Sequence, residues 1–383
     1  MLWILTDKRG VLTDKCIHLT DKSADLTDKN TNGPIKDVQN PFMQDSSADM
    51  SKKACKESDE MIKKPCKKPI KMLKLEALTR RLPEHHPKHH LITSDYRKIH
   101  TGHKGERAIG AELAYLSGEF YIFHDLRLQH DATRFFQLDL LLLSKNVMII
   151  IEVKNFAGSL YFDRLYPQLI RTKDGQEQAY LDPLLQVNIQ KSRLIDWMRL
   201  HKFPEIPIET LIANANPNAI IKTTPGHTSI FNQITGKETL NARIRTLENK
   251  YPSHLLTQRQ FNKLSNSFLQ KNTPLNQNIL HVYQIPETEL LKGVQFPECM
   301  ALPMKRGRGK WICPSCSHSS KNAHLQALHD FALLFRPTVT NKDVRSFLQI
   351  ESGTVANRIL SGMKVDHYGS YKGREYVLEW EVD

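Results

Sequence analysis

The residues best suited to do chemistry are two carboxylates and a lysine near the middle of the chain: Asp139, Glu152 and Lys154. Asp139 lies in an apolar stretch of strand length, residues 135–144, whereas Glu152 and Lys154 end a β-branched stretch, residues 147–154. If the Lys-Asn pair between the stretches forms a tight turn, counting outward places Asp139 opposite Glu152. Lys154 then points to the same face as Glu152, because side chains alternate along a strand.

Two carboxylates that face each other across a hairpin repel, unless a cation lies between them. Carboxylate oxygens suit a hard divalent ion such as Mg²⁺ or Mn²⁺, and a lysine can hold an anionic oxygen. Asp139, Glu152 and Lys154 therefore have the chemistry needed to cut a phosphodiester. The alternative is that Glu152 and Lys154 form a surface pair at a strand end, with Asp139 opposite them by a coincidence of register.

The composition favours a cytoplasmic protein with a polyanionic partner. The 383 residues contain no apolar run that could span a membrane, and the apolar start of the chain is too short for a signal peptide. The formal net charge is +13. Residues 1–60 hold nine Lys/Arg and eleven Asp/Glu, so +15 remains on the rest of the chain. This charge favours nucleic acid, although a solvated basic surface is the alternative.

Residues 1–60 differ from the rest of the chain. Leu-Thr-Asp-Lys recurs there at a seven-residue period, at 5–8, 12–15, 19–22 and 26–29. The segment is polar and poor in aromatic residues, so it is predicted to be disordered. Our hypothesis is that Met61 is the natural start and that residues 1–60 are an extension that is not native.

Residues 61–290 alternate between helical and strand patterns. A helix is predicted from Ile70, and a second opens at Gly105–Glu106. The histidine-rich stretch 85–90 is interpreted as an exposed basic loop, because no carboxylate or cysteine accompanies it at ligand spacing. Further elements are a strand at 121–125, the hairpin, a helix from 182 to about 200, a strand at 206–213, and helices at 238–249 and 257–270. This order indicates an α/β domain built on a mixed sheet.

Five short motifs in this region match a known pattern. They are Gly102-x-x-Gly105-Glu106, His124-Asp125-Leu126, Phe136-Gln137-Leu138-Asp139, Ile151-Glu152-Val153-Lys154-Asn155 with Gly158, and Pro183-x-x-Gln186. The set resembles the NERD (nuclease-related) domain of the PD-(D/E)XK superfamily, most strongly over residues 102–190. Leu140 departs from the usual histidine of that pattern. The resemblance implies a restriction-endonuclease-like mixed sheet flanked by helices.

The resemblance also implies roles for individual residues. Asp139 and Glu152 correspond to the metal-binding carboxylates and Lys154 to the motif lysine. Glu106 corresponds to a helix glutamate that completes the metal shell, and Gln186 to a helix glutamine near the site, although Gln186 could equally be a surface residue. The implied function is Mg²⁺- or Mn²⁺-dependent hydrolysis of DNA. The alternative is a catalytically weak nucleic-acid-binding adaptor with the same fold.

Three cysteines in the last third of the chain, Cys299, Cys313 and Cys316, resemble part of a zinc ribbon. The first cysteine pair is broken, because Phe296 stands where the resemblance asks for its first cysteine, three residues before Cys299. Either His318 or His324 supplies a fourth zinc ligand, or the metal has been lost and packing holds the module. The intervening loop is predicted to contact a phosphate backbone through Lys305, Arg306, Arg308 and Lys310, unless it is a solvated turn.

Residues 340–360 predict two short helices separated by a turn, typical of a helix-turn-helix. Thr354, Asn357 and Arg358 are expected on the exposed face of the second helix, where they would read DNA. The stretch 368–381 is predicted to form a wing hairpin, which would make the module winged-helix-like. A generic helical hairpin would produce the same pattern.

These observations divide the chain into six segments. They are a disordered extension (1–60), a helical and basic lead-in (61–101), a nuclease-like core (102–225), a helical extension (226–290), a zinc-ribbon-like module (291–321) and a helix-turn-helix-like module (322–383). The predicted fold class is α/β with two small C-terminal modules. The predicted partner is nucleic acid, with DNA favoured, and no membrane is involved.

Overall fold

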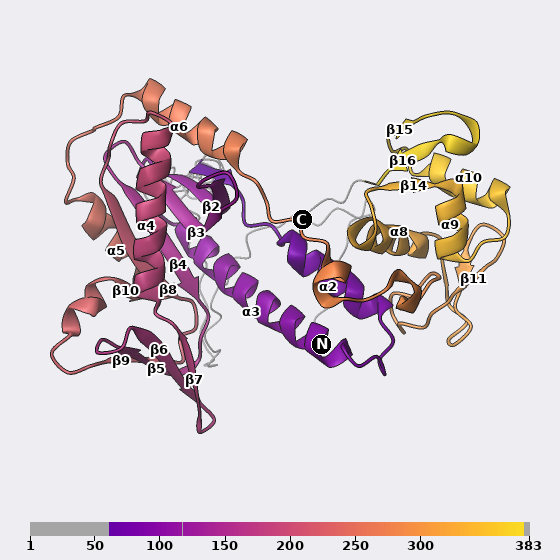
Figure 1. Cartoon of the computed structure of the whole chain (residues 1–383), viewed down its shortest axis with the longest axis horizontal. Coiled ribbons are helices and arrows are strands. Elements are labelled where there is room, and N and C mark those ends of the chain that lie inside the picture. Colours follow the sequence, from indigo (N-terminus) through magenta and orange to yellow (C-terminus); the bar gives the residue numbers. More distant parts are fainter. Residues whose placement is uncertain (1–60, 117, 379–383) are drawn as a thin grey trace, which may run out of the picture. The chain divides into compact units, whose positions relative to one another are not determined.

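The structure is a computed structural model, and it describes residues 61–116 and 118–378 (Figure 1). The Leu-Thr-Asp-Lys repeats and the predicted disorder of residues 1–60 lie outside the described residues. Within the described part, none of the helices has both the length and the apolar character needed to cross a membrane.

A six-stranded mixed sheet carries the middle of the chain (Figure 1). Its three central antiparallel strands are joined on both sides by parallel neighbours. In sheet order the strands are β1 (Ile62–Lys64), β2 (Tyr121–Gln129), β3 (Phe135–Leu143), β4 (Met148–Lys154), β8 (Ile208–Asn214) and β10 (Ile234–Gly236). Strands β3 and β4 are buried on both faces, which explains their nearly continuous apolar sequences. The predicted mixed α/β architecture is confirmed.

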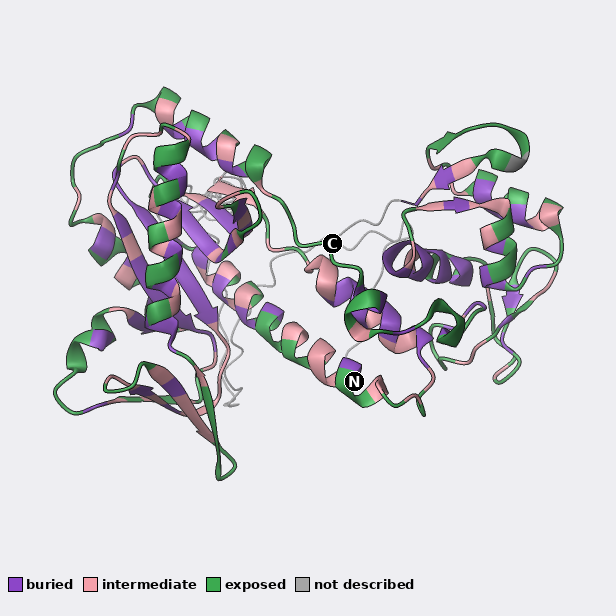
Figure 2. Ribbon diagram, viewed as in Figure 1, coloured by how far each residue is buried: buried purple, intermediate pink, exposed green. Residues whose placement is uncertain are grey.

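Helices cover both faces of this sheet (Figure 2). Helices α3 (His89–Leu113) and α5 (Leu240–Glu248) share one apolar cluster with alternate residues of β3 and β4. The other alternate residues pack against α4 (Pro183–Leu200) and α6 (Gln258–Lys271). The alternation of side chains along the strands therefore divides the core into two layers.

The hairpin has the predicted register. Leu143 pairs with Met148 and Leu140 pairs with Ile151, so counting one position further places residue 139 opposite residue 152. The turn is closed by a bond from the Ser144 amide to the Val147 carbonyl (3.0 Å).

The predicted start of α3 is wrong. The helix begins at His89 rather than at Gly105, so it crosses the predicted boundary at residue 102, and it ends at Leu113. Its first half is mostly half-exposed or exposed, and an apolar stripe therefore does not mark it. The predicted loop at 85–90 is shorter than expected, because its last two histidines already belong to this helix. Strand β2 is also longer than the predicted 121–125.

A second, four-stranded sheet was not predicted. Its order is β7-β6-β5-β9, with β5 (Gly158–Asp163), β6 (Gln168–Lys173), β7 (Gln176–Leu181) and β9 (Ala219–Thr223). Asp174 and Gly175 join β6 to β7, both with positive φ (53° and 74°), as a tight hairpin turn requires. Apolar residues of this sheet pack against Leu184 and Val187 at the start of α4.

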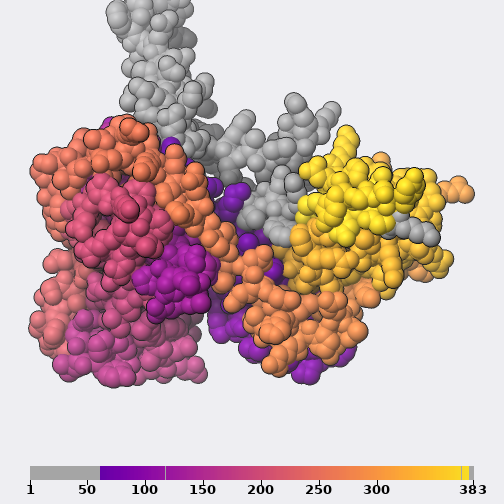
Figure 3. Space-filling model, turned by 45° about the horizontal axis from the view of Figure 1, so that its top comes forward, coloured from indigo at the N-terminus to yellow at the C-terminus, as the bar shows by residue number. Residues whose placement is uncertain are grey.

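Helix α2 (Ile70–Arg81) links the N-terminal and C-terminal parts of the described chain. Its apolar residues cluster with α7 (Ile279–Tyr283) and with the end of α8 (Ala323–Leu334). Arg80 and Arg81 both donate to the buried carboxylate of Asp330 on α8, at 2.7 Å each. The segment that follows α6 runs across α2 (Figure 3), where Lys74 Nζ donates to Asn276 Oδ1 at 2.6 Å.

The last third of the chain holds two small three-stranded sheets. The first contains β11 (Lys305–Arg306), β12 (Trp311–Ile312) and β13 (Ser319–Ser320). After α8 follow β14 (Thr338–Thr340), α9 (Asn341–Leu348), α10 (Gly353–Gly362), β15 (His367–Tyr368) and β16 (Glu375–Val377), with the sheet order β14-β16-β15. Thr340 and Ser352 cap α9 and α10, so the two predicted short helices are confirmed. The described 3₁₀ turns are Thr228–Asn232, Lys237–Thr239, Glu287–Glu289 and Tyr371–Gly373.

Candidate functional site

Glu152 is the most tightly held carboxylate at the end of β4. It is 2% exposed, and both of its oxygens accept hydrogen bonds. Lys154 Nζ and Gln186 Nε2 each donate to Oε1 at 2.6 Å, and Gln190 Nε2 donates to Oε2 at 2.9 Å. The two glutamines lie one turn apart on α4, which Asp182 caps by accepting from the Leu184 amide. The structure thus brings together the predicted Glu152, Lys154 and Gln186.

Asp139 lies at the end of β3, beside Glu152. Its Oδ2 accepts a hydrogen bond from the Val153 amide at 2.9 Å. Burial raises the pKa of Asp139 well above its usual range, and the nearby carboxylates of Glu152 and Glu106 raise it further. The fold therefore places this carboxyl where ionisation is costly.

Glu106 reaches the same place from α3. A Cβ on Gly105 would lie 2.7 Å from the Cβ of Asn155, so the missing side chain allows α3 to lie against the end of β4. Burial and the carboxylates of Asp125 and Glu152 raise the pKa of Glu106 to about 7. A helix residue and two strand residues thus form one acidic cluster.

Sequence reasoning missed three residues here: Asp125, Lys64 and Gln190. Asp125 interrupts the regular backbone of β2 with a positive φ (49°). Its Oδ1 accepts a hydrogen bond from Gln137 Nε2 at 2.5 Å, and burial raises its pKa. Lys64 Nζ donates to the carbonyls of His124 and Asp125, at 2.7 Å each. Two of them could have been found from the sequence. Asp125 belongs to one of the motifs that carry the family resemblance, and Gln190 follows Gln186 by four residues, which places both on one helix face.

The donor set of this carboxylate cluster fits a hard divalent cation. Four carboxylates, Glu106, Asp125, Asp139 and Glu152, gather near two lysines, and all of the anionic donors are oxygens. Among the described residues, two three-residue groups have ligand atoms all within 4.8 Å of one another, and neither contains Asp139 or Glu152. A cation shared by these two carboxylates therefore requires side-chain movement, since Lys154 and the glutamines already hold Glu152.

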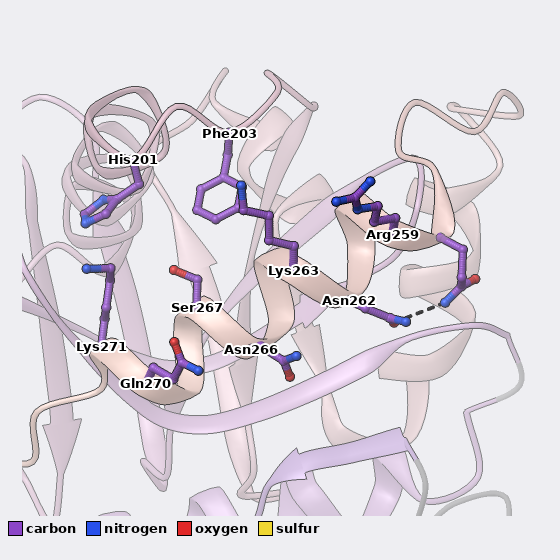
Figure 4. Close-up of a pocket in the computed structure, with 10 residues that line it drawn as sticks. His201, Phe203, Arg259, Asn262, Lys263, Asn266, Ser267, Gln270 and Lys271 are labelled. Atoms are coloured by element: carbon purple, nitrogen blue, oxygen red, sulfur yellow. Dashed lines mark hydrogen bonds between the residues drawn. The ribbon is translucent and has the colours of Figure 1, made fainter.

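A pocket of about 470 Å³ opens beside the cluster. Its walls combine the acidic Glu106 and Asp125 with basic side chains, namely Lys64, Lys67, Lys68, Lys71 and Arg127. Such a wall attracts a polyanion toward the carboxylates. A larger pocket of about 850 Å³ lies along α6 (Figure 4), where Arg259, Lys263 and Lys271 point from the helix. None of its lining residues is a carboxylate, so it lacks the chemistry of the first pocket.

The C-terminal cysteines also come together. Cys299 Sγ lies 3.4 Å from Cys313 Sγ and 3.6 Å from Cys316 Sγ. Neither predicted histidine joins this group. His324 Nδ1 accepts from the Trp311 indole at 3.2 Å, and His318 Nδ1 donates to the Cys316 carbonyl at 3.1 Å. Phe296, in place of a fourth thiolate, is buried and stacks against His318 (ring centroids 6.3 Å apart). The three cysteines could hold zinc as a three-thiolate site.

The predicted nucleic-acid contacts lie on the β11–β12 hairpin and on α10. Arg306 lies over the Trp311 ring (4.9 Å), and burial together with the nearby Arg358 lowers its pKa. The hairpin and α10 therefore bring two guanidinium groups near each other. The other predicted residues, Lys305, Arg308, Lys310, Thr354 and Asn357, are exposed. Asn357 Oδ1 also accepts from Asn341 Nδ2 at 2.6 Å, which ties α10 to α9.

Comparison with known proteins bears on the region that holds the carboxylates. The family model for the nuclease-related domain, NERD, matches residues 101–214. The match runs from the second half of α3 through β8, and it includes all four carboxylates and both glutamines. Searches of curated proteins and of solved structures gave no match.

Proposed function

We propose, from the match of residues 101–214 to a nuclease-related domain, that this chain is a metal-dependent nuclease that hydrolyses phosphodiester bonds of DNA. The observation that carries the proposal is the cluster of Asp139, Glu152 and Glu106 at the end of the hairpin, with Lys154 bonded to Glu152 at 2.6 Å. This arrangement supports assigning the core to the PD-(D/E)XK superfamily, whose pattern requires an acid, a second acid and a lysine.

Asp139 and Glu152 would hold Mg²⁺ or Mn²⁺, with Glu106 beside them. When bound, the cation would lower the pKa of a water and neutralise charge on the scissile phosphate. Lys154 would leave Glu152 and donate to an anionic oxygen of the reacting phosphate. Gln190 would keep the Glu152 carboxylate oriented through Oε2 during this exchange, while Gln186 would leave Oε1 together with Lys154.

DNA would be held both beside the site and at the C-terminal modules. The lysine-lined pocket next to Glu106 would take the phosphate backbone near the scissile bond. The order α8, β14, α9, α10, β15, β16 is that of a winged helix, which supports α10 as a reading helix with Thr354, Asn357 and Arg358 on its open face. The hairpin residues Lys305, Arg306, Arg308 and Lys310 would contact phosphates, and the three cysteines would hold a structural zinc ion.

A second candidate function is a nucleic-acid-binding adaptor with little activity. One observation favours it: three donors occupy both oxygens of Glu152, and the carboxylates do not converge on one point. If Lys154 and Gln186 do not leave, no cation can bridge Asp139 and Glu152. The basic pocket would then bind nucleic acid without cutting it.

Cleavage of supercoiled and linear DNA, single- and double-stranded, in Mg²⁺ and Mn²⁺ tests the proposal. The whole chain is compared with Asp139→Asn and Lys154→Ala. We expect each variant to lose at least about 100-fold in rate, as removal of a group that acts on the transition state does. Asp174→Asn and Lys173→Ala, on the exposed β6–β7 turn, are matched controls that should cut like the unaltered chain.

Two outcomes would contradict the nuclease. Cleavage that persists in both site variants would come from a contaminant or from another site. No cleavage with either metal, together with DNA binding that weakens steeply as salt rises, would establish the adaptor instead.

A further inference from the structure

A second group of metal-ligating side chains lies next to the carboxylate cluster. Cys66 follows β1, and His103 and Glu106 lie one turn apart on the same face of α3. Cys66 Sγ is 3.9 Å from His103 Nδ1, and His103 Nδ1 is 3.7 Å from Glu106 Oε2. All three ligand atoms lie within 4.8 Å of one another. His103 is buried, and Cys66 and Glu106 are half-buried.

These distances fit a small tetrahedral ion. With Zn–S near 2.3 Å and Zn–N and Zn–O near 2.0–2.2 Å, tetrahedral ligands lie about 3.4–3.6 Å apart. The contacts of Cys66 and Glu106 with His103 exceed that separation by only a few tenths of an ångström. The donors are one sulfur, one nitrogen and one oxygen. This set selects borderline ions such as Zn²⁺ or Co²⁺ over Mg²⁺.

Two other roles for Cys66, His103 and Glu106 account for fewer of these observations. A cysteine–histidine nucleophile must face the pocket in which a substrate would bind, but neither Cys66 nor His103 lines the pocket beside Glu106, and His103 is buried. A structural hydrogen bond accounts for the 3.9 Å contact between Cys66 and His103, but it does not involve Glu106. Neither role explains why a carboxylate completes the group.

We propose that Cys66, His103 and Glu106 form an inhibitory site for a zinc-class ion. Glu106 belongs to both groups. Its Oε2 lies near His103, and its carboxylate also interacts electrostatically with Asp125 and Glu152. An ion bound by Cys66 and His103 would fix Glu106 away from Asp139 and Glu152. Micromolar zinc would then suppress cleavage supported by Mg²⁺. This second step rests on the proposed nuclease function, whereas the binding site itself does not.

Cobalt(II) tests the site without any need for activity, because a thiolate ligand gives Co²⁺ a charge-transfer band in the near ultraviolet. The whole chain carrying Cys299→Ser, Cys313→Ser and Cys316→Ser lacks the competing C-terminal thiolates. We expect this protein to bind one Co²⁺ with a thiolate band, and the further change Cys66→Ser to remove the band and weaken binding by roughly 100-fold. An unchanged spectrum after Cys66→Ser would overturn the site. Zn²⁺ displacing Co²⁺ in an equal ratio would support it.

Inhibition is measured separately, on chains that retain the C-terminal cysteines. If the unaltered chain cuts DNA, Zn²⁺ should inhibit it at a concentration about 100-fold lower than it inhibits Cys66→Ser. Equal inhibition of both proteins would overturn the inhibitory role. If the chain does not cut at all, the nuclease proposal fails, and the cobalt titration still decides the binding site. Far-ultraviolet circular dichroism of each serine variant shows whether a lost signal reflects unfolding.

Discussion

Two acidic residues of this protein are buried in opposite ways. Asp330 on α8 is fully buried, and its oxygens accept from Arg80 and Arg81 at 2.7 Å each and from Gln326 at 3.1 Å. Asp139 at the end of β3 has one hydrogen bond, from a backbone amide, and its closest charged neighbours include two other carboxylates. The first acid is neutralised within the protein, whereas the second is not.

The difference separates a structural acid from a functional one. A buried charge that is paired and hydrogen-bonded holds elements together, and its loss leaves its partners uncompensated. Carboxylates buried beside one another raise each other's pKa, which costs folding energy and is typical of a site that binds a cation or a proton. The stability of the fold should therefore respond in opposite directions when the two kinds of acid are neutralised.

Neutralising the structural acid should have the largest effect on stability. Asp330→Asn removes the anion that pairs with Arg81, which is 1% exposed, and leaves Arg80 with Glu76 alone, so we expect a loss of about 3–5 kcal/mol in the free energy of unfolding. Denaturant unfolding measures it. Glu76→Gln is the control, because Glu76 also pairs with Arg80 but is half-exposed, and its loss should cost less than about 1 kcal/mol. Equal losses in the two variants would mean that the buried Asp330 stabilises the fold no more than the half-exposed Glu76 does.

Neutralising a carboxylate of the candidate site should instead stabilise the metal-free protein. The pKa of Glu106 is about 7 in the folded chain against an ordinary 4.5. The protonated Glu106 side chain contributes stability to the fold that is fully present below pH 4.5 and is lost as the pH rises through 7. Glu106→Gln should therefore raise the free energy of unfolding by about 3 kcal/mol at pH 8 and by little at pH 4.5, while cleavage is lost.

Denaturant unfolding in EDTA at the two pH values tests this gain. A gain that is equal at both would show that the effect is not linked to ionisation of Glu106.

The approach of α3 to β4 can be disturbed without touching any charge. Gly105→Ala places a methyl group 2.7 Å from the Asn155 side chain, so we expect a loss of about 1–3 kcal/mol and slower cleavage, because Glu106 moves with the helix. Gly102→Ala is a matched control on the same helix. A Cβ there meets nothing within 4 Å, and the change should stabilise by about 0.5–1 kcal/mol. Thermal unfolding and cleavage rates of the pair compare the two glycines. Similar behaviour of the two would mean that the close approach does not position Glu106.

The smallest effect concerns cations on the pocket wall. Arg80 and Arg81 are committed to Asp330, whereas Lys67 is an exposed residue that lines the pocket beside Glu106. Lys67→Ala should weaken DNA binding a few-fold and reduce the slope of log K against log salt by about 0.9. Binding titrations at several salt concentrations measure this, with Lys173→Ala as the control. An unchanged slope would mean that Lys67 does not contact the DNA phosphates.

Local chemistry allowed the hairpin of the candidate site to be predicted from sequence. The turn at residues 145–146 and the β-branched strands set the register, so the pairing that places Asp139 opposite Glu152 could be counted along the chain. The helix from residue 182 and the two short helices within 340–360 could also be predicted, and the structure shows that Asp182, Thr340 and Ser352 cap them. In each case the decisive contacts lie within a few residues of one another.

Contacts distant in sequence were missed. Strand β1 is three residues long and pairs with β2 sixty positions later, so nothing near Lys64 announces its part in the site. The sheet of β5, β6 and β7 was missed for a different reason, since its short strands carry many polar residues. Asp174-Gly175 is the strongest short signal for a hairpin and was present in the sequence.

The link between α2 and α8 also has a consequence for synthesis of the chain. Arg81 leaves the ribosome 249 residues before Asp330. At roughly 5–20 residues per second, its anion arrives about 10–50 seconds later. Every residue of the carboxylate cluster, together with Lys154 and both glutamines, has been made by residue 190. The carboxylate cluster is therefore synthesised well before the anion that neutralises Arg81, and until α8 is made the part of α2 that packs against α8 has no partner.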